Sequence, residues 1–157
     1  MQSVRSPVLD TIGSLIGLFG QAEVTVGIAF GLAVARARRS ARDGLVPLLI
    51  IVLIAIEALL KILVPHAPPP PEVSRTVELL PSLHVPFVNS FPSGHVARIA
   101  FLAGIARGVP TWLGVAAVVL MIASRLYLGE HWLSDCLGGL ALGYFAAKVA
   151  RLLERPP

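Results

Sequence analysis

The sequence contains little of what soluble proteins use to fold and to stay dissolved. Cysteine occurs once, at Cys136, which excludes an internal disulfide framework. Charged residues make up only 14% of the 157 residues. A soluble domain of this length has a polar surface to cover and rarely contains so little charge. The shortage of charge therefore argues against the soluble class.

Apolar residues are abundant instead. They make up 55% of the chain, and the mean hydropathy is +0.80. They form continuous runs and do not alternate with polar residues, which excludes a closed β-barrel. We therefore predict an all-α integral membrane protein with a single domain over residues 1–157.

Five apolar runs match the roughly 20 residues that a helix needs to cross a bilayer. They cover about residues 12–35, 45–64, 92–108, 110–127 and 131–152, with a polar, proline-rich outer loop at 65–91. The loop segment TVELLPSL (76–83) is compatible with a short lid helix and equally with a plain connector. A cleaved signal peptide explains the first run less well, because the run is long and contains Glu23.

Most basic residues outside the motifs fall on one side of this predicted bundle. If the five helices alternate in direction, eight of ten share a side: Arg36, Arg38, Arg39, Arg42, Arg107, Lys148, Arg151 and Arg155. Arginine and lysine mark the cytoplasmic side of membrane proteins. We predict a multi-pass protein of the cell (inner) membrane with its N-terminus outside and its C-terminus in the cytoplasm. Topology explains the arginine cluster better than nucleic-acid binding does.

Polar and ionisable residues collect at the outer ends of four predicted helices. Such residues are costly inside a bilayer and are usually functional. They are Lys61, Ser93, His95, Arg98, Ser124, Arg125, His131 and Asp135. The sequence therefore predicts one site near the non-cytoplasmic surface.

The spacing of these residues indicates chemistry on an anion. His131 and Asp135 are four residues apart, so they share a helix face, and a carboxylate beside an imidazole holds its tautomer. The stretch 92–95, Pro-Ser-Gly-His, opens a helix, and a helix N-terminus binds anions. Lys61 and Arg125 add positive charge, which favours a phosphate and opposes a metal ion. We expect no metal and no cofactor.

Two of these stretches resemble motifs of a known family. P-S-G-H at 92–95 and S-R-x5-H-x3-D at 124–135 are similar to motifs two and three of the type 2 phosphatidic acid phosphatase superfamily. That family includes bacterial lipid phosphatases, soluble acid phosphatases and vanadium haloperoxidases. The resemblance covers about residues 57–152, and five predicted spans argue against the soluble haloperoxidases.

The resemblance implies a role for each matching residue. His131 would be the nucleophile and form a phosphohistidine, Asp135 would orient it, and His95 would protonate the leaving group. The residues that would hold the phosphate oxygens are Ser93, Gly94 and Arg125.

The first family motif, K-x6-R-P, is incomplete. Lys61 and the second proline of 68–69 fit, but the arginine is absent. We favour Arg98 as the substitute, because it follows His95 by one helical turn and its guanidinium suits phosphate. The rivals are Arg75 and His66 of the outer loop, and the plainer interpretation of Arg98 is a side chain that snorkels to lipid headgroups.

Several residues outside the matched motifs receive structural interpretations. Glu57 precedes Lys61 by four residues, and we expect it to orient that lysine as an ion pair. His66 and His84 lie in the outer loop, where we expect solvated side chains. The glycine pairs 13/17, 27/31 and 139/143 each offer a surface for close helix packing.

Together these observations predict a metal-independent lipid phosphate phosphatase. It would hydrolyse a phosphomonoester or pyrophosphate headgroup through a phosphohistidine. A phosphotransferase with the same site is the nearest alternative, and a non-catalytic lipid-binding or transport subunit is another. The expected partners are the bilayer and a membrane lipid phosphate, without nucleic acid; a homo-oligomer is a compatible assembly.

Overall fold

The computed structural model describes residues 6–79 and 87–154. Within these ranges the chain forms seven α-helices, one short 3₁₀ helix and no strand, so the predicted all-α class is confirmed. The helices are α1 (Pro7–Leu18), α2 (Ala22–Ala37), α3 (Ala41–Leu48), α4 (Ile50–Leu63), the 3₁₀ helix η1 (Pro71–Val73), α5 (Gly94–Ile105), α6 (Thr111–Tyr127) and α7 (Leu133–Leu152).

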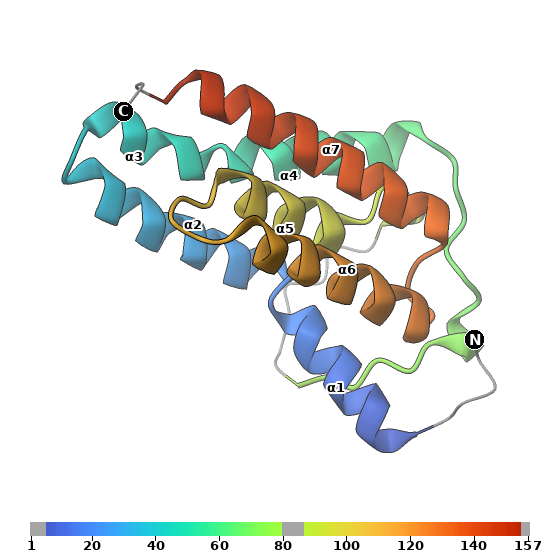
Figure 1. The fold of residues 1–157 in the computed structure, drawn as a ribbon. Coiled ribbons are helices and arrows are strands. Elements are labelled where there is room, and N and C mark those ends of the chain that lie inside the picture. The colour runs from blue at the N-terminus through green and yellow to red at the C-terminus, as the bar shows by residue number, and fades with distance from the viewer. Residues whose placement is uncertain (1–5, 80–86, 155–157) are drawn as a thin grey trace.

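Helix α5 is the central element of the bundle, with α2, α4, α6 and α7 packed around it (Figure 1). Its side chains Phe101 and Ile105 are fully buried and pack in one cluster with Leu53 of α4. Burial of such side chains away from water is the main source of stability in this cluster. The helix that begins with the P-S-G-H motif is therefore also the helix that organises the core.

Helix α7 approaches α5 along a strip without side chains. A Cβ atom at Gly139 would overlap the carbonyl oxygen of Ser93, and one at Gly143 would overlap that of Ala97. The predicted close packing at this glycine pair is confirmed. The pair at 27 and 31 behaves differently, because nothing lies within 4 Å of a Cβ at either position.

The first predicted span, residues 12–35, is interrupted in the structure. It consists of α1 and α2, which meet at a bend of 44° across Phe19–Gln21. The last carbonyl groups of a helix lack intrahelical partners. One of the carbonyls freed at this break, that of Gly20, accepts a hydrogen bond from Nε of Arg98 at 3.0 Å. The break is thus stabilised by a contact with another helix, which the local sequence does not reveal.

The other predicted spans agree more closely with the helices. The span at 45–64 corresponds to α3 and α4 together, with a short interruption near Pro47 and Leu49. Proline lacks the N–H that a helix interior needs, which explains the irregular turn. The last three predicted spans match α5, α6 and α7 within three residues at each end.

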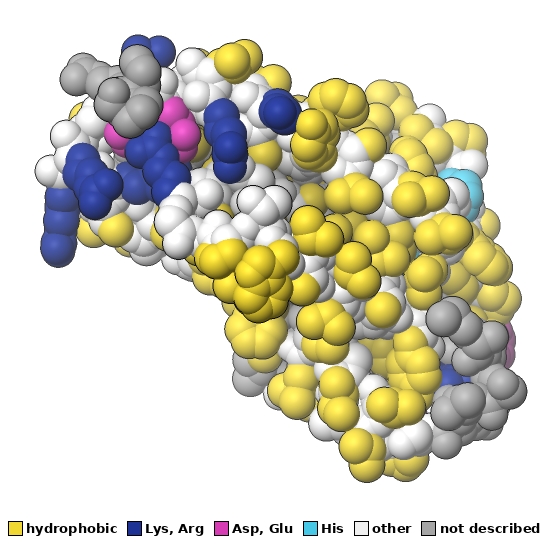
Figure 2. Space-filling view, in the orientation of Figure 1, with side chains coloured by type: hydrophobic (Ala, Val, Ile, Leu, Met, Phe, Trp, Pro, Cys, Tyr) yellow, Lys and Arg dark blue, Asp and Glu magenta, His cyan; other side chains and the backbone are white. Residues whose placement is uncertain are grey.

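Length and composition alone identify fewer membrane helices than the sequence predicted. Ala41–Leu63 is long and apolar enough to cross a bilayer, and the bent pair α1 and α2 passes the same test as one broken span. Helices α5 and α6 are apolar but shorter. Much of the bundle surface is nevertheless apolar: Figure 2 shows hydrophobic side chains over most of one face, with Lys and Arg gathered at one end.

The outer loop is anchored to the bundle where the structure describes it. Glu130, in the turn before α7, accepts hydrogen bonds from Ser74 and Thr76, each at 2.6 Å. Residues 76–79 are not helical, and residues 80–86, which include the rest of the proposed lid segment and His84, lie outside the described residues. The described part of the loop is therefore a strap tied to the start of α7.

Candidate active site

The predicted site residues lie at one end of the bundle. Lys61 belongs to the last turn of α4, Ser124 and Arg125 to the last turn of α6, and Asp135 to the first turn of α7. His95 in the first turn of α5 interacts electrostatically with the other members from four segments, namely Lys61, Arg98, Arg125 and His131. The fold thus brings together residues that are up to 74 positions apart, from Lys61 to Asp135 (135 − 61).

The imidazole of His131 is held by a buried carboxylate. Its Nδ1 lies 3.1 Å from Oδ2 of Asp135, and the same oxygen accepts the backbone N–H of Trp132 at 3.0 Å. Asp135 is fully buried, and it also caps the N-terminus of α7. His131 itself precedes the first residue of α7, so cap geometry positions it rather than a shared helix face. A proton on Nδ1 leaves Nε2 with a free lone pair.

The second oxygen of Asp135 faces another histidine. Nδ1 of His66 lies 3.3 Å from Oδ1 of Asp135, although His66 was expected to be solvated. Its side chain is 35% exposed, so it lies at the mouth of the site. The sequence offers a weak signal for this position: His66 falls inside the incomplete first motif, five residues after Lys61.

Lys61 is buried at the site but has a different partner from the one predicted. Its Nζ donates to the carbonyl oxygen of Ser90 at 3.1 Å and lies over the ring of Phe87. Glu57 does not form the predicted ion pair with Lys61. It binds Arg98 of α5 instead, because its carboxylate rests against Gly94, where the lack of a side chain leaves room.

Arg98 is buried and makes two contacts with protein groups. Its Nη1 lies 2.5 Å from Oε2 of Glu57, and its Nε donates to the carbonyl of Gly20. A guanidinium has five N–H donors, and those on Nη2 have no hydrogen-bond partner in the part of the chain that the structure describes. Arg98 thus ties α5 to α4 and to the break between α1 and α2, beside His95.

Arg125 lies against α1. Its Nη2 donates to Oγ of Ser124 at 3.0 Å, and Oγ of Ser124 donates to the carbonyl of Gly13 at 2.9 Å. The guanidinium packs where Gly17 has no side chain, since a Cβ there would overlap Nη2. Gly17 therefore makes room for Arg125 at the site, whereas a Cβ at Gly13 would meet the side chain of Leu128.

The N-terminus of α5 offers an unused hydroxyl group. Ser93 is the N-cap, and its backbone N–H donates to the carbonyl of Asp135 at 2.9 Å. Its Oγ is buried and has no hydrogen-bond partner among the described residues. Buried hydroxyl groups are almost always hydrogen-bonded, so an unpaired one at a helix N-terminus is suited to an anionic ligand.

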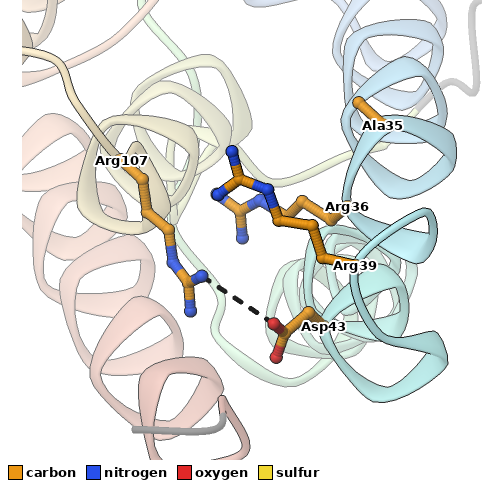
Figure 3. A pocket seen from close by; sticks show the side chains of 5 residues that line it. All are labelled: Ala35, Arg36, Arg39, Asp43 and Arg107. Carbon is orange, nitrogen blue, oxygen red and sulfur yellow. Dashed lines mark ion pairs between the residues drawn. The ribbon is translucent and has the colours of Figure 1, made fainter. Parts of the chain in front are cut away.

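A cleft at the opposite end contains none of these residues. It has a volume of about 210 Å³ and is lined by Ala35, Arg36, Arg39, Asp43 and Arg107 (Figure 3). Arg107 lies 3.8 Å from Asp43 and 3.0 Å from Glu154, which also pairs with Arg36. These pairs join the ends of α2, α3 and α7 at the basic end of the bundle.

Comparisons with known proteins agree with the motif assignment. The sequence model of the PAP2 superfamily matches residues 44–155. The Escherichia coli (strain K12) protein named "Putative undecaprenyl-diphosphatase YbjG" is 36% identical over 75 residues, which are 45% of this chain and 38% of that protein. The chain therefore spans well under half the length of this curated relative.

A solved structure shares the fold. It is the crystal structure described as the first transmembrane PAP2 type phosphatidylglycerolphosphate phosphatase from Bacillus subtilis. The match has a TM-score of 0.76 and 22% sequence identity, and it covers 94% of this chain and 77% of that one. At this identity the likeness establishes the architecture of the helix bundle.

Proposed function

The chain belongs to the PAP2 superfamily, and from this premise we propose that it is a metal-independent lipid phosphate phosphatase. The observation that carries the proposal is the contact between Nδ1 of His131 and the fully buried Asp135, with His95 nearby. A histidine oriented in this way is equipped for nucleophilic attack on phosphorus. The unpaired Oγ of Ser93 and the cations Lys61 and Arg125 support a phosphate as the group that binds.

The proposed reaction has two displacement steps. Nε2 of His131 attacks phosphorus, and the bond between phosphorus and the leaving oxygen breaks while His95 gives that oxygen a proton. His95 then takes a proton from a water molecule whose oxygen attacks the phosphorus, and the bond between phosphorus and Nε2 of His131 breaks. Inorganic phosphate leaves and His131 is restored. Asp135 stabilises the positive charge that His131 carries in between.

The phosphate holders are proposed from their place around these groups. Ser93 and Gly94 lie at the N-terminus of α5, and Arg125 and Lys61 supply positive charge. Arg98 is proposed to contact phosphate through Nη2, because its Nη1 and Nε are already bound to Glu57 and to the carbonyl of Gly20. Charge that develops on phosphate oxygens in the transition state would be stabilised by these donors.

A lipid is the proposed substrate because the site lies at one end of an apolar bundle. A lipid headgroup can enter such a site laterally while its tails remain in hydrocarbon. The names of the relatives mention an undecaprenyl diphosphate and a phosphatidylglycerol phosphate. We propose a lipid phosphomonoester or pyrophosphate of the non-cytoplasmic leaflet, since the site lies at the last turns of α4 and α6 and the arginine-lined cleft lies at the opposite end of the bundle.

The test is phosphate release by the purified protein in detergent, with phosphatidate, phosphatidylglycerol phosphate and a polyprenyl pyrophosphate as substrates. His131→Asn should abolish release while the protein elutes normally on gel filtration, because the covalent nucleophile is lost. Asp135→Asn should cause a smaller but still large loss. Release by His131→Asn above about a tenth of the wild-type rate would contradict this role.

Isotopic labelling separates hydrolysis from transfer. In water labelled with ¹⁸O, hydrolysis places one labelled oxygen in the released phosphate. A phosphotransferase would instead pass the phosphoryl group to an added lipid or sugar hydroxyl. A wild-type protein that binds these lipids and turns over none of them would favour the non-catalytic alternative.

A further inference from the structure

Two imidazoles flank one carboxylate at the site. Nδ1 of His131 lies 3.1 Å from Oδ2 of Asp135, and Nδ1 of His66 lies 3.3 Å from Oδ1. The two histidines come from different segments, since His66 follows α4 and His131 precedes α7. The carboxylate between them is fully buried.

The backbone around His66 is fixed by hydrogen bonds on both sides. Its N–H donates to Oδ1 of Asn89 at 3.0 Å, and its carbonyl accepts the N–H of Ser90 at 2.9 Å. Nδ2 of Asn89 in turn donates to the carbonyl of Lys61 at 2.8 Å. The two ends of the outer loop are therefore hydrogen-bonded to each other at His66, and this pairing fixes the position from which the imidazole reaches Asp135.

A second tie fixes the same segment to α7. The indole N–H of Trp132, the N-cap of that helix, donates to the carbonyl of Ala67 at 2.9 Å. His66 and Asp135 are thus held relative to each other by bonds on either side of their contact. Such support is what a side chain needs in order to orient another one.

One oxygen of the Asp135 carboxylate lacks a hydrogen-bond donor among the described residues and lies next to the imidazole of His66. Oδ1 of Asp135 is buried and makes no hydrogen bond of good geometry to any described residue, whereas Oδ2 accepts two. A buried carboxylate oxygen without a donor is costly. Nδ1 of His66 lies 3.3 Å from this oxygen and also 3.3 Å from Oγ of Ser90, so an N–H at this position can be shared between the carboxylate and the hydroxyl group.

We propose that His66 is a positioning residue for the catalytic carboxylate; this rests on the proposed function. An N–H on Nδ1 of His66 donates to Oδ1 of Asp135. The carboxylate plane is then fixed from both sides, and Oδ2 remains directed at His131. His66 does not contact phosphate in this assignment, because its Nδ1 faces Asp135 and its Nε2 lies 3.4 Å from Oγ of Ser134.

Two substitutions of similar shape test this assignment. His66→Asn keeps an N–H donor near the position of Nδ1, whereas His66→Leu removes it. We expect His66→Leu to lower kcat by about 10-fold to 100-fold with little change in KM, as for other residues that orient a catalytic group. His66→Asn should recover most of the loss. Ser74→Ala is the control, because it alters the same outer loop through Glu130 and does not contact Asp135.

Two kinetic results would overturn the assignment. If His66→Leu raised KM and left kcat unchanged, His66 would be a substrate contact. If His66→Asn were as impaired as His66→Leu, the N–H donor would not be what the site uses.

A measurement that needs no activity separates this inference from the proposed function. The chain has four histidines, so ¹⁵N-histidine spectra of the full protein in micelles can be assigned by single substitutions. Asp135→Asn should shift the Nδ1 signals of both His66 and His131. If both shift in a protein that releases no phosphate, the contact stands and the phosphatase proposal fails. A His66 signal that does not respond overturns the inference whatever the activity.

Discussion

Arg98 of α5 and Glu57 of α4 form a buried ion pair, with Nη1 and Oε2 2.5 Å apart. The pair joins the helix of His95 to the helix of Lys61. The same guanidinium donates to the carbonyl of Gly20, so three segments meet at one side chain. The geometry of the site thus depends on a contact that none of the family motifs contains.

The pair predicts a strong effect on stability. Arg98→Ala leaves the carboxylate of Glu57 buried without its partner, which typically costs about 3–5 kcal/mol. We expect a clearly lower Tm in thermal denaturation in detergent. The double variant Glu57→Gln/Arg98→Met should regain much of the loss, because no unpaired charge remains. A Tm of Arg98→Ala equal to that of the wild type would show that the pair contributes little.

The double variant also tests the proposed contact of Arg98 with phosphate. Once folding is restored, the loss of one transition-state donor should still lower turnover by about 10²-fold or more. Near wild-type turnover in a well-folded double variant would remove Arg98 from the phosphate site and leave it a structural role alone.

The sequence predicted the helices well where local signals are strong. Pro92 and Pro110 mark the starts of α5 and α6, and the apolar runs that follow have the right lengths. The break at Gly20 was missed because the run contains no proline and the stabilising donor, Arg98, lies 78 residues away. Local propensity carries no information about a contact of that range.

The partners of individual charges were predicted less well, for a related reason. Spacing places Glu57 and Lys61 on one face of α4, but it does not say which other helices present a competing charge to that face. The close approach at Gly94 lets Arg98 take Glu57, and Lys61 turns to Ser90. His66 was missed likewise, because its contact with Asp135 joins the loop after α4 to the first turn of α7, 69 residues further along the chain.

Activity should not depend on a divalent metal ion. Lys61 and Arg125 lie near His95 and supply the positive charge that a metal would otherwise provide. We expect phosphate release to be unchanged by EDTA and inhibited by vanadate, which adopts a five-coordinate form at a histidine. Loss of activity with EDTA, followed by recovery with magnesium or zinc, would contradict the proposal. The control is a known metal-dependent phosphatase in the same buffer.

The site should face away from the cytoplasm. In a Cys136→Ser background, a cysteine at Glu72 of η1 should react with a membrane-impermeant maleimide on intact cells or spheroplasts, because η1 belongs to the outer loop. A cysteine at Ala41, the exposed first residue of α3 at the basic end, should react only after lysis. The reverse pattern would show that the site faces the cytoplasm, and the substrate would then be a lipid of the cytoplasmic leaflet.

The break between α1 and α2 should matter for catalysis through Gly20. A Cβ at this position would lie 2.8 Å from Cδ2 of His95 and 2.9 Å from Cε of Met121. The backbone at Gly20 does not have a positive φ, so alanine introduces no backbone strain and acts only by contact. We expect Gly20→Ala to displace the imidazole of His95 and to lower kcat by roughly 10-fold to 100-fold, since small misplacements of a catalytic group are costly.

Gly27→Ala is the matched control, because nothing lies within 4 Å of a Cβ at that position on α2. Alanine favours the helix over glycine, so this variant should fold at least as well as the wild type and keep its turnover. Turnover is measured by phosphate release and folding by Tm for both variants. If Gly20→Ala were as active as Gly27→Ala, His95 would not depend on the turn at Gly20 for its position. If both were equally impaired, the effect would belong to the helices and not to the contact with His95.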